Sequence, residues 1–356
     1  MSDYYLPLEI QIEIIKKLPV KPLIQFRSVS KSWKSLIDSS EFIANYHFNN
    51  DQLQHHRVLV RYSSSINPTK TKYVSIVDDG SFPRDKIRLI VPSNIRRLLG
   101  KNPSILGSSQ GVLACASISV IFLTVPMRFG FGVSPRTSVP KLVKITFISR
   151  SPSIKNRTPQ VEIFSLSLGS WRRSLSTNVP RKSIDLDRNH VCVDKCIYLY
   201  AFDRTVTGET YQNKNLILSF DMTTEEFSEI DLCDGLKEEY AGDAYGCYGY
   251  LSISKLGTSL VVLQPKDGYY EEHSVWRMEH GVPNSFTKLF VIKSPIESLR
   301  IHRVHDFRKP GEPIIKTKKL VVFEPESGEI SDIGNSCCDY SSIAKSYIVT
   351  LVLLDS

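Results

Sequence analysis

The sequence predicts a multidomain α+β protein: a small all-α module at the N-terminus, followed by a large all-β domain of the β-propeller type. Three observations predict this class. Helical apolar periodicity is confined to the first 48 of 356 residues, and short β-branched runs separated by Gly, Pro, Ser and Asn follow from residue 57. An aromatic hairpin pattern also recurs at intervals of roughly 50 residues. We therefore expect one domain at residues 1–48 and another at residues 49–356.

The N-terminal module is expected to start with a helix that is apolar on two faces. Leu6-Pro7 opens this helix, because a proline near the first helical position loses no hydrogen bond through its missing N–H. One apolar stripe consists of Leu8, Ile12 and Ile15, and the other consists of Ile10, Ile14 and Leu18. Both stripes need burial, and a module this small has little core to offer. One stripe is therefore left for the rest of the chain or for another protein.

Further short helices are expected within the same module. Leu18-Pro19 ends the first helix, because proline disfavours helical geometry at the residue before it. A second helix can start at Pro22, and Ser30 is a suitable N-cap for a third. The apolar residues of these helices are Leu23, Phe26 and Val29 in the second and Trp33, Leu36 and Ile37 in the third. Glu41–Phe48 adds a final turn or two.

The remainder of the chain reads as an all-β domain with many short strands. No long helical pattern occurs after residue 50, although Asp231–Glu239 can hold one turn. The expected strands are Arg57–Tyr62, Lys72–Val77, Val120–Val125, Leu142–Ile148, Val161–Leu166, Cys192–Phe202, Leu216–Phe220, Leu260–Gln264, Leu289–Ile292, Leu320–Phe323 and Tyr347–Leu354.

A hairpin pattern recurs four times in this domain: a strand ending in an aromatic residue, a polar turn, and a second apolar residue. The copies span residues 161–171, 216–227, 275–286 and 320–330, and the third has a longer turn. Their anchor residues Phe164, Phe220, Trp276 and Phe323 lie 56, 56 and 47 residues apart. Such spacing is typical of propeller blades. An ordinary β-sandwich with aromatic hairpins remains the alternative.

Composition limits the class of protein. Hydrophobic residues make up 41% and charged residues 23% of the chain, which predicts a folded core and argues against wholesale disorder. No apolar run is long enough for a membrane helix, and the N-terminus shows no signal peptide. The seven cysteines are irregularly spaced, which predicts reduced thiols and a cytoplasmic or nuclear location.

The net charge of +8 is unevenly distributed. Residues 49–182 carry 21 Lys and Arg against 5 Asp and Glu, whereas residues 183–356 carry 18 against 27. The favoured interpretation is that two oppositely charged sectors of one domain face each other and the solvent. A basic surface that recruits an acidic partner is the alternative, and such recruitment would weaken with salt.

The first 48 residues resemble the F-box. The resemblance combines two Leu-Pro pairs, Leu6-Pro7 and Leu18-Pro19, with the run Val29-Ser30-Lys31-Ser32-Trp33 at the family's spacing. The sequence departs from frequent plant F-box residues at Gln25, Ser28 and Ser30.

The rest of the chain resembles the F-box-associated domain of plant F-box proteins, often labelled F-box/kelch-repeat. The resemblance includes Gly107–Leu113, Phe129–Pro135 with Pro140–Ile145, Val161–Arg172, Phe220–Phe227, and Trp276 to Phe290. The family usually carries a Trp-Asn-Pro segment where Cys115 to Phe129 runs here, so a strand or turn of one blade is expected to be missing.

The resemblance implies the substrate-recognition subunit of an SCF-type ubiquitin ligase, with no catalytic activity and no cofactor of its own. The F-box would bind a Skp-type adaptor, and through it cullin and RING subunits, while the β domain would hold an unidentified protein substrate. The residues implied for adaptor binding are Leu6, Pro7, Ile10, Ile14, Leu18, Pro19, Val20, Leu23, Phe26, Val29, Trp33, Leu36 and Ile37. Some of these pack internally instead, and Trp33 fits a core and an interface equally well.

Residues that could carry chemistry do not assemble into a recognised motif. Cys192 and Cys196 have no second pair at zinc spacing and are expected to share one face of a strand as packed core residues. His302 and His305 are expected in a loop, without a third metal ligand. Gly130-Phe-Gly132 lacks the third glycine of a dinucleotide site. Basic dyads such as Arg96-Arg97 are too scattered to predict nucleic-acid binding.

Two other functions remain open from the sequence. In one, the F-box is vestigial and the β domain recognises a protein, glycan or nucleic acid outside ubiquitination. In the other, the propeller carries an enzyme site, which would require convergent carboxylates or metal ligands. An intact adaptor surface distinguishes the ligase subunit from the first alternative.

Overall fold

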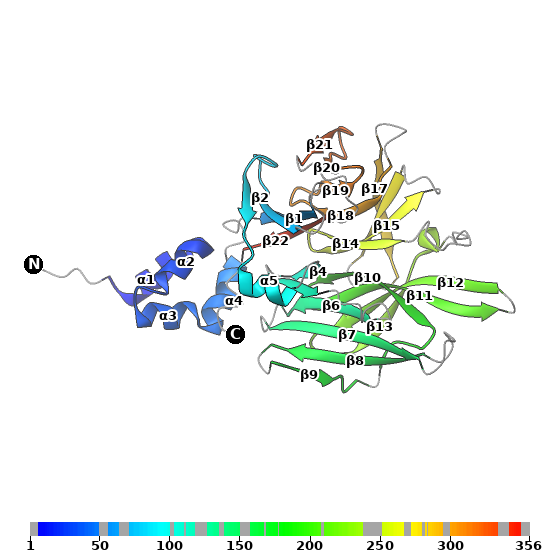
Figure 1. Ribbon diagram of the computed structural model, residues 1–356, viewed down its shortest axis with the longest axis horizontal. Coiled ribbons are helices and arrows are strands. Elements are labelled where there is room, and N and C mark those ends of the chain that lie inside the picture. The colour runs from blue at the N-terminus through cyan, green and yellow to red at the C-terminus, as the bar shows by residue number, and fades with distance from the viewer. Residues whose placement is uncertain are drawn as a thin grey trace, which may run out of the picture.

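The computed structural model describes residues 6–49, 56–63, 71–99, 103–109, 112–117, 127–134, 139–149, 157–166, 169–176, 178–207, 210–237, 251–266, 272–279, 282, 284–294, 300–333 and 342–349. Four short helices lie at one end of the long axis, and most of the described residues beyond them form a five-blade β-propeller (Figure 1). The predicted fold class is therefore confirmed, and the β-sandwich alternative is wrong.

The helical module consists of α1 (Leu8–Lys16), α2 (Val20–Phe26), α3 (Lys31–Ile37) and α4 (Ser40–Asn49). The predicted cap of the third helix is present, since the Trp33 backbone N–H donates to Ser30 Oγ at 3.1 Å. The second helix starts two residues earlier than expected, at Val20, so Pro22 lies within its first turn. No intrahelical hydrogen bond is lost there, because the first N–H groups of a helix have no partner.

Each blade is a four-stranded antiparallel sheet. The first contains β22 (Ile343–Ile348), β1 (His56–Ser63), β2 (Thr71–Val77) and β3 (Lys86–Leu89). The second contains β6 (Met127–Val133), β7 (Pro140–Ser149), β8 (Arg157–Ser165) and β9 (Ser170–Arg173), and the third contains β10 (Ile184–Val193), β11 (Cys196–Thr207), β12 (Thr210–Asp221) and β13 (Phe227–Asp231). The fourth contains β14 (Ser252–Leu256), β15 (Ser259–Lys266), β16 (Glu272–Met278) and β17 (Phe286–Lys293), and the fifth contains β18 (Arg303–Phe307), β19 (Pro313–Lys316), β20 (Leu320–Phe323) and β21 (Ile330–Asp332).

A two-stranded sheet, β4 (Pro103–Ser109) with β5 (Val112–Ser117), occupies a position of its own in the ring. The innermost strands contact one another in the order β22, β4, β6, β10, β14, β18 and back to β22. The β4–β5 hairpin therefore lies between the first and second blades. It has two described strands, whereas each blade has four. The expected strand Val120–Val125, and most of the stretch where the Trp-Asn-Pro segment is missing, lie outside the described residues.

Pairing of the two chain ends closes the ring. The C-terminal strand β22 pairs with β1, and Val58 lies opposite Ser346 in this register. The first blade thus takes its innermost strand from the end of the chain and its other three from the beginning. Loss of either end would leave one blade incomplete.

The four recurring hairpins are the outer strand pairs of four successive blades, β8–β9, β12–β13, β16–β17 and β20–β21. Phe164 lies opposite Trp171, and Phe220 lies opposite Phe227, with ring centroids 5.3 and 4.9 Å apart. The anchor predicted for the third copy is wrong. β16 continues two residues past Trp276 before the turn, so Met278 lies opposite Phe286 and Trp276 lies opposite Lys288.

Several local predictions need correction. Cys192–Phe202 is not one strand: β10 ends at Val193 and β11 begins at Cys196, because Asp194 adopts a left-handed turn conformation with φ 50°. Cys192 and Cys196 therefore lie on different strands rather than on one face of a single strand. His305 lies within β18 and not in a loop.

Two short helices follow the helical module. The helical turn expected within Asp231–Glu239 exists as η2 (Asp234–Leu236). The helix α5 (Ser93–Leu99) was not expected, because it is only seven residues long and carries two adjacent arginines in its last turn. None of the helices in the described part of the chain is long and apolar enough to cross a membrane.

Hydrophobic side chains join the helical module to the propeller. One cluster contains Ile15, Leu23 and Ile37 of the helices together with Phe131 and Val133 of β6. Val349, just beyond β22, packs against the same cluster. One stripe of the two-faced first helix is thus buried through Ile15, as a module with too little core of its own requires.

Candidate functional site

The residues predicted for adaptor binding divide into buried, partly buried and exposed groups. Leu23 and Ile37 have no exposed surface, and Val20 is 7% exposed, so these three side chains form the interior of the helical module. Leu18, Phe26, Trp33 and Leu36 are partly buried and pack against the same cluster, and Pro19 is also partly buried. Whether any of these residues contacts an adaptor remains a prediction.

The exposed group lies on the first helix and directly before it. Ile10 and Ile14 are each 49% exposed and lie four residues apart on one face of α1, and Leu6, which is 45% exposed, precedes the helix. These three side chains are termed the exposed stripe. Pro7 is exposed beside them, and Val29, between α2 and α3, is 65% exposed. Leu8 and Ile24 are also exposed, although neither belonged to the predicted set. This is an unusual quantity of exposed apolar surface for so small a module, and such surface marks interaction sites.

Hydrogen bonds from Trp33 hold the start of the first helix in place. The Trp33 ring packs edge-on against Phe26 with centroids 4.9 Å apart, and its Nε1–H donates to Gln11 Oε1 at 3.2 Å. Gln11 Nε2 in turn donates to the Leu6 carbonyl oxygen at 2.7 Å. Trp33 therefore has an internal structural role, and through it the position of Leu6 is linked to α3.

Two further contacts hold the helices against one another. The Arg27 guanidinium binds both carboxylate oxygens of Asp38, at 2.5 and 2.8 Å, which connects the ends of α2 and α3 and raises the pKa of Arg27. Tyr46 of α4 donates its hydroxyl to the Leu18 carbonyl oxygen at 2.7 Å, and burial raises the pKa of Tyr46 to about 12. Tyr46 was missed in the sequence, although Phe42 and Tyr46 are spaced as one face of a helix.

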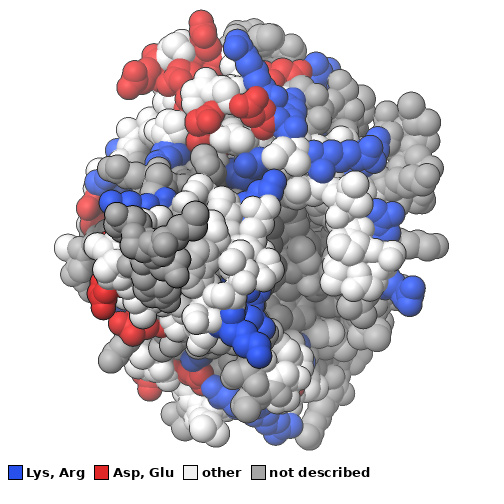
Figure 2. All heavy atoms as spheres, turned by 90° about the vertical axis from the view of Figure 1, so that its left-hand side faces the viewer, with Lys and Arg blue, Asp and Glu red and all other residues white. Residues whose placement is uncertain are grey.

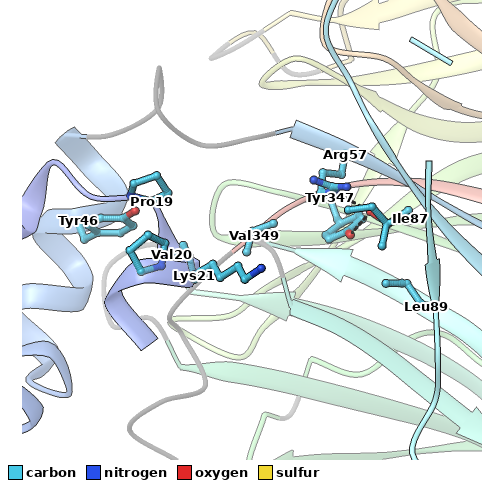
Figure 3. Close-up of a pocket in the computed structure, with 11 residues that line it drawn as sticks. Pro19, Val20, Lys21, Tyr46, Arg57, Ile87, Leu89, Tyr347 and Val349 are labelled. Atoms are coloured by element: carbon cyan, nitrogen blue, oxygen red, sulfur yellow. Dashed lines mark hydrogen bonds between the residues drawn. The ribbon is translucent and has the colours of Figure 1, made fainter. Parts of the chain in front are cut away.

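A cavity of about 430 Å³ separates the helical module from the first blade (Figure 3). Pro19, Val20, Lys21, Pro22 and Tyr46 line it from the helices. Arg57, Ser75, Ile87, Leu89, Tyr347 and Val349 line it from the propeller. Figure 3 shows the two groups of side chains facing each other across the gap, with Val349 between them. The cavity is mainly apolar, with the cationic side chains of Lys21 and Arg57 at its wall.

The charge asymmetry is partly neutralised within the propeller. Lys141 and Arg172 of the second blade bind Glu225 of the third at 2.8 and 2.5 Å. Burial acts to raise the pKa of Glu225, but the hydrogen bonds from Arg172 and Lys141 outweigh it and lower the pKa. These contacts support the interpretation that oppositely charged sectors face each other. On the face that carries the helices, acidic residues gather at the top and basic residues extend across the middle and right (Figure 2).

The described residues contain no group of three or more His, Cys, Asp or Glu side chains that could hold a metal ion. Cys192 is buried and Cys196 is partly buried, and both are free thiols. Burial raises the pKa of both thiols, which makes them poor nucleophiles at neutral pH.

Comparison with known families agrees with this architecture. Residues 126–347 match the F-box associated beta propeller domain, which is more than half of the chain. The chain belongs to this family of F-box proteins. Residues 5–45 match the F-box domain, so that α1 to α3 and the first half of α4 form the F-box.

Curated relatives of the F-box protein come from Arabidopsis thaliana. F-box protein At3g07870 is 23% identical over an alignment covering 92% of this chain and 87% of the relative. F-box protein At1g52495 is 24% identical, with 65% of this chain and 57% of the relative covered. Two further F-box relatives are 24 and 26% identical, and the chain spans only 62 and 63% of their lengths. The chain thus joins an F-box to an F-box associated beta propeller domain.

Proposed function

We propose that this F-box protein is the substrate-recognition subunit of an SCF-type ubiquitin ligase. Its F-box binds a Skp-type adaptor, which connects it to cullin and RING subunits, and its propeller binds the target protein. The exposed stripe of Leu6, Ile10 and Ile14 on a domain that matches the F-box carries this proposal. The chain itself acts as a non-catalytic receptor, and ubiquitin transfer is performed by other subunits. A cytoplasmic or nuclear location follows from the same role.

The buried residues of the F-box support the proposal indirectly. Ile15, Leu23 and Ile37 hold the helices together and bind them to the propeller cluster, whereas Ile10 and Ile14 on the other stripe stay 49% exposed. An adaptor that covers this stripe would remove apolar surface from water, which favours association by roughly 25 cal/mol for each Å² buried.

Co-expression with a Skp-type adaptor, scored by copurification, tests the proposal. The double variant Ile10→Asp/Ile14→Asp should reduce the copurified adaptor by more than about tenfold, because two charges would be buried without partners at the interface. Both side chains are exposed, so the thermal unfolding temperature should stay close to that of the wild type. A matched control is Leu175→Asp/Val179→Asp, which changes two exposed apolar residues of the propeller and should leave copurification unchanged.

Either of two results would contradict the proposal. One is a folded wild-type chain that does not retain the adaptor, which would favour the alternative of a binding protein with a vestigial F-box. The other is equal retention by the wild type and by Ile10→Asp/Ile14→Asp, which would place the contact elsewhere. Point variants of the full chain are preferable to removal of the F-box, because removal would expose Phe131 and Val133 of the propeller.

A further inference from the structure

The outermost strand of the first blade differs from the outer strands of the other blades. β3 pairs with β2 along one edge, with Tyr73 opposite Leu89 and Ile76 opposite Lys86. No described strand pairs with its other edge, and all four of its residues are exposed. Ile87 is 54% exposed, and Ile90, directly after the strand, is 83% exposed. An exposed apolar edge of this kind is a template for pairing with another chain.

The charges at this edge are all of one sign. Lys86, Arg88, Arg96 and Arg97 lie on β3 and α5, and no acidic residue occurs from position 86 to position 99. Arg88, Arg96 and Arg97 are exposed and form no salt bridge with a described residue. Lys86 is different, because its Nζ donates to the Ile333 carbonyl oxygen at 2.5 Å. Asp85, directly before the strand, is exposed and accepts a hydrogen bond from Ser81 Oγ.

The outer strands of the other four blades each carry a charge that is neutralised by a described residue. The pairs are Arg172 of β9 with Glu225, Glu229 of β13 with Arg181, Lys293 of β17 with Glu272, and Asp332 of β21 with Lys319. β3 differs from these strands because none of its charges forms a salt bridge with a described residue, and it also carries the exposed apolar side chains Ile87 and Leu89. Both properties are consistent with an acidic partner.

The two faces of β3 present different chemistry. Side chains alternate along a strand, so Ile87 and Leu89 lie on one face, and Lys86 and Arg88 lie on the other. Ile87 and Leu89 line the cavity together with Pro22 of α2 and with Pro19, which caps that helix. A strand added at this edge would thus place every second side chain on the apolar cavity side. The intervening side chains would lie on the side of Arg88.

We propose that the edge of β3 binds an extended acidic peptide segment of the target protein as an added fifth strand. The peptide pairs its backbone with the open edge, apolar residues on one face pack beside Ile87 and Leu89, and acidic residues on the other face meet Arg88. Cross-strand pairs of this kind, apolar with apolar and acidic with basic, are those that stabilise antiparallel sheets. This inference rests on the proposed function, because it names the chemistry of the segment that the ligase subunit recruits.

A fluorescein-labelled decapeptide that alternates Glu and Val is a direct probe, with binding to the full chain measured by fluorescence anisotropy. Arg88→Glu should weaken binding by about tenfold, because it replaces an attraction by a repulsion. The matched control Arg173→Glu makes the same change on β9, an exposed outer strand of the second blade, and should change binding by less than about twofold. A peptide with Lys in place of Glu should bind much more weakly. A peptide N-methylated at alternate residues should also lose affinity, because it cannot complete the strand pairing.

Three outcomes would overturn the inference. The first is that the Lys and Glu peptides bind with equal affinity. The second is that Arg88→Glu and Arg173→Glu weaken binding of the Glu peptide equally. The third is that a single-stranded oligonucleotide binds in an Arg88-dependent way while the Glu peptide does not bind. Adaptor copurification, scored on the same Arg88→Glu sample, separates this inference from the proposed function. Adaptor retention without peptide binding by the wild type rejects only the site at β3. Peptide binding without adaptor retention rejects only the ligase function.

Discussion

Removal of the Asp78 carboxylate should destabilise the propeller, because this group closes the ring between the fifth and first blades. Asp78 follows β2, and its Oδ1 accepts from Arg308 Nε at 2.7 Å, while its Oδ2 accepts from the Lys309 backbone N–H at 2.8 Å. The exposed fractions of the two side chains are 1% for Asp78 and 9% for Arg308. Arg308 also pairs with Glu312 and lies over the Phe82 ring at 4.0 Å.

The size of the effect follows from burial. Removal of one partner from a buried ion pair typically costs about 3–5 kcal/mol, because the remaining charge is left without compensation. Glu312 still neutralises part of the Arg308 charge, so the lower end of this range is expected for Asp78→Ala. Urea denaturation of the full chain, followed by tryptophan fluorescence, measures the free energy of unfolding. The control Asp231→Ala breaks the exposed pair with Lys214 at 2.7 Å and should cost less than about 1 kcal/mol.

The double variant Asp78→Ala/Arg308→Met sharpens this test. It removes both charges and keeps an apolar side chain over Phe82, so it should be more stable than Asp78→Ala alone. Equal loss in Asp78→Ala and Asp231→Ala would refute the reasoning, because burial would then not determine the cost. A double variant that is less stable than the single one would show that Arg308 acts independently of Asp78.

Two further predictions concern buried histidines and the contact between the F-box and the propeller. Burial lowers the pKa of His190 to about 3 and that of His273 to about 4, so both bind protons more readily when unfolded. The free energy of unfolding should therefore fall as the pH drops below about 6.5, by roughly 1.4 kcal/mol per pH unit for each histidine, and His190→Gln should show a shallower decline in thermal melts between pH 7.5 and 5. Phe131→Ala should accelerate hydrogen exchange in α4 more than Phe323→Ala does, since only Phe131 belongs to the cluster shared with the F-box, although both side chains are buried. Equal exchange in the two variants would mean that the F-box is independent of the propeller.

The general architecture could be predicted because its signals are local. Pro7, Pro19 and Ser30 mark helix ends through backbone chemistry that needs no tertiary contact. The aromatic hairpins repeat because each blade packs its outer strand pair in the same way. Phe164 with Trp171 and Phe220 with Phe227 show this directly. The error at Trp276 arose because β16 extends two residues beyond it to Met278, and the length of a strand before its turn is not fixed by the aromatic pattern.

The division of F-box residues into buried and exposed could not be predicted, because it depends on distant segments. A helix that is apolar on two faces does not reveal which face meets the rest of its own chain. Ile15 and Leu23 are buried in a cluster that includes Phe131 and Val133, more than 90 residues away in the sequence. A resemblance to a family shows which sequence positions correspond to the family motif, but it does not show which of those side chains are exposed to solvent in this chain. For the same reason Leu23 and Ile37 appeared among the predicted contact residues although they have no exposed surface.

The exposed stripe and the β3 edge differ in their relation to the cavity between the F-box and the first blade. None of the residues that line the cavity belongs to the exposed stripe of Leu6, Ile10 and Ile14, whereas Ile87 and Leu89 of β3 line it. Val20 of α2 belongs to the interior of the F-box and also lines the cavity, so the F-box and β3 share this cavity. A target segment held at β3 would then lie next to the F-box, and a receptor that brings a target close to a ligase requires such proximity.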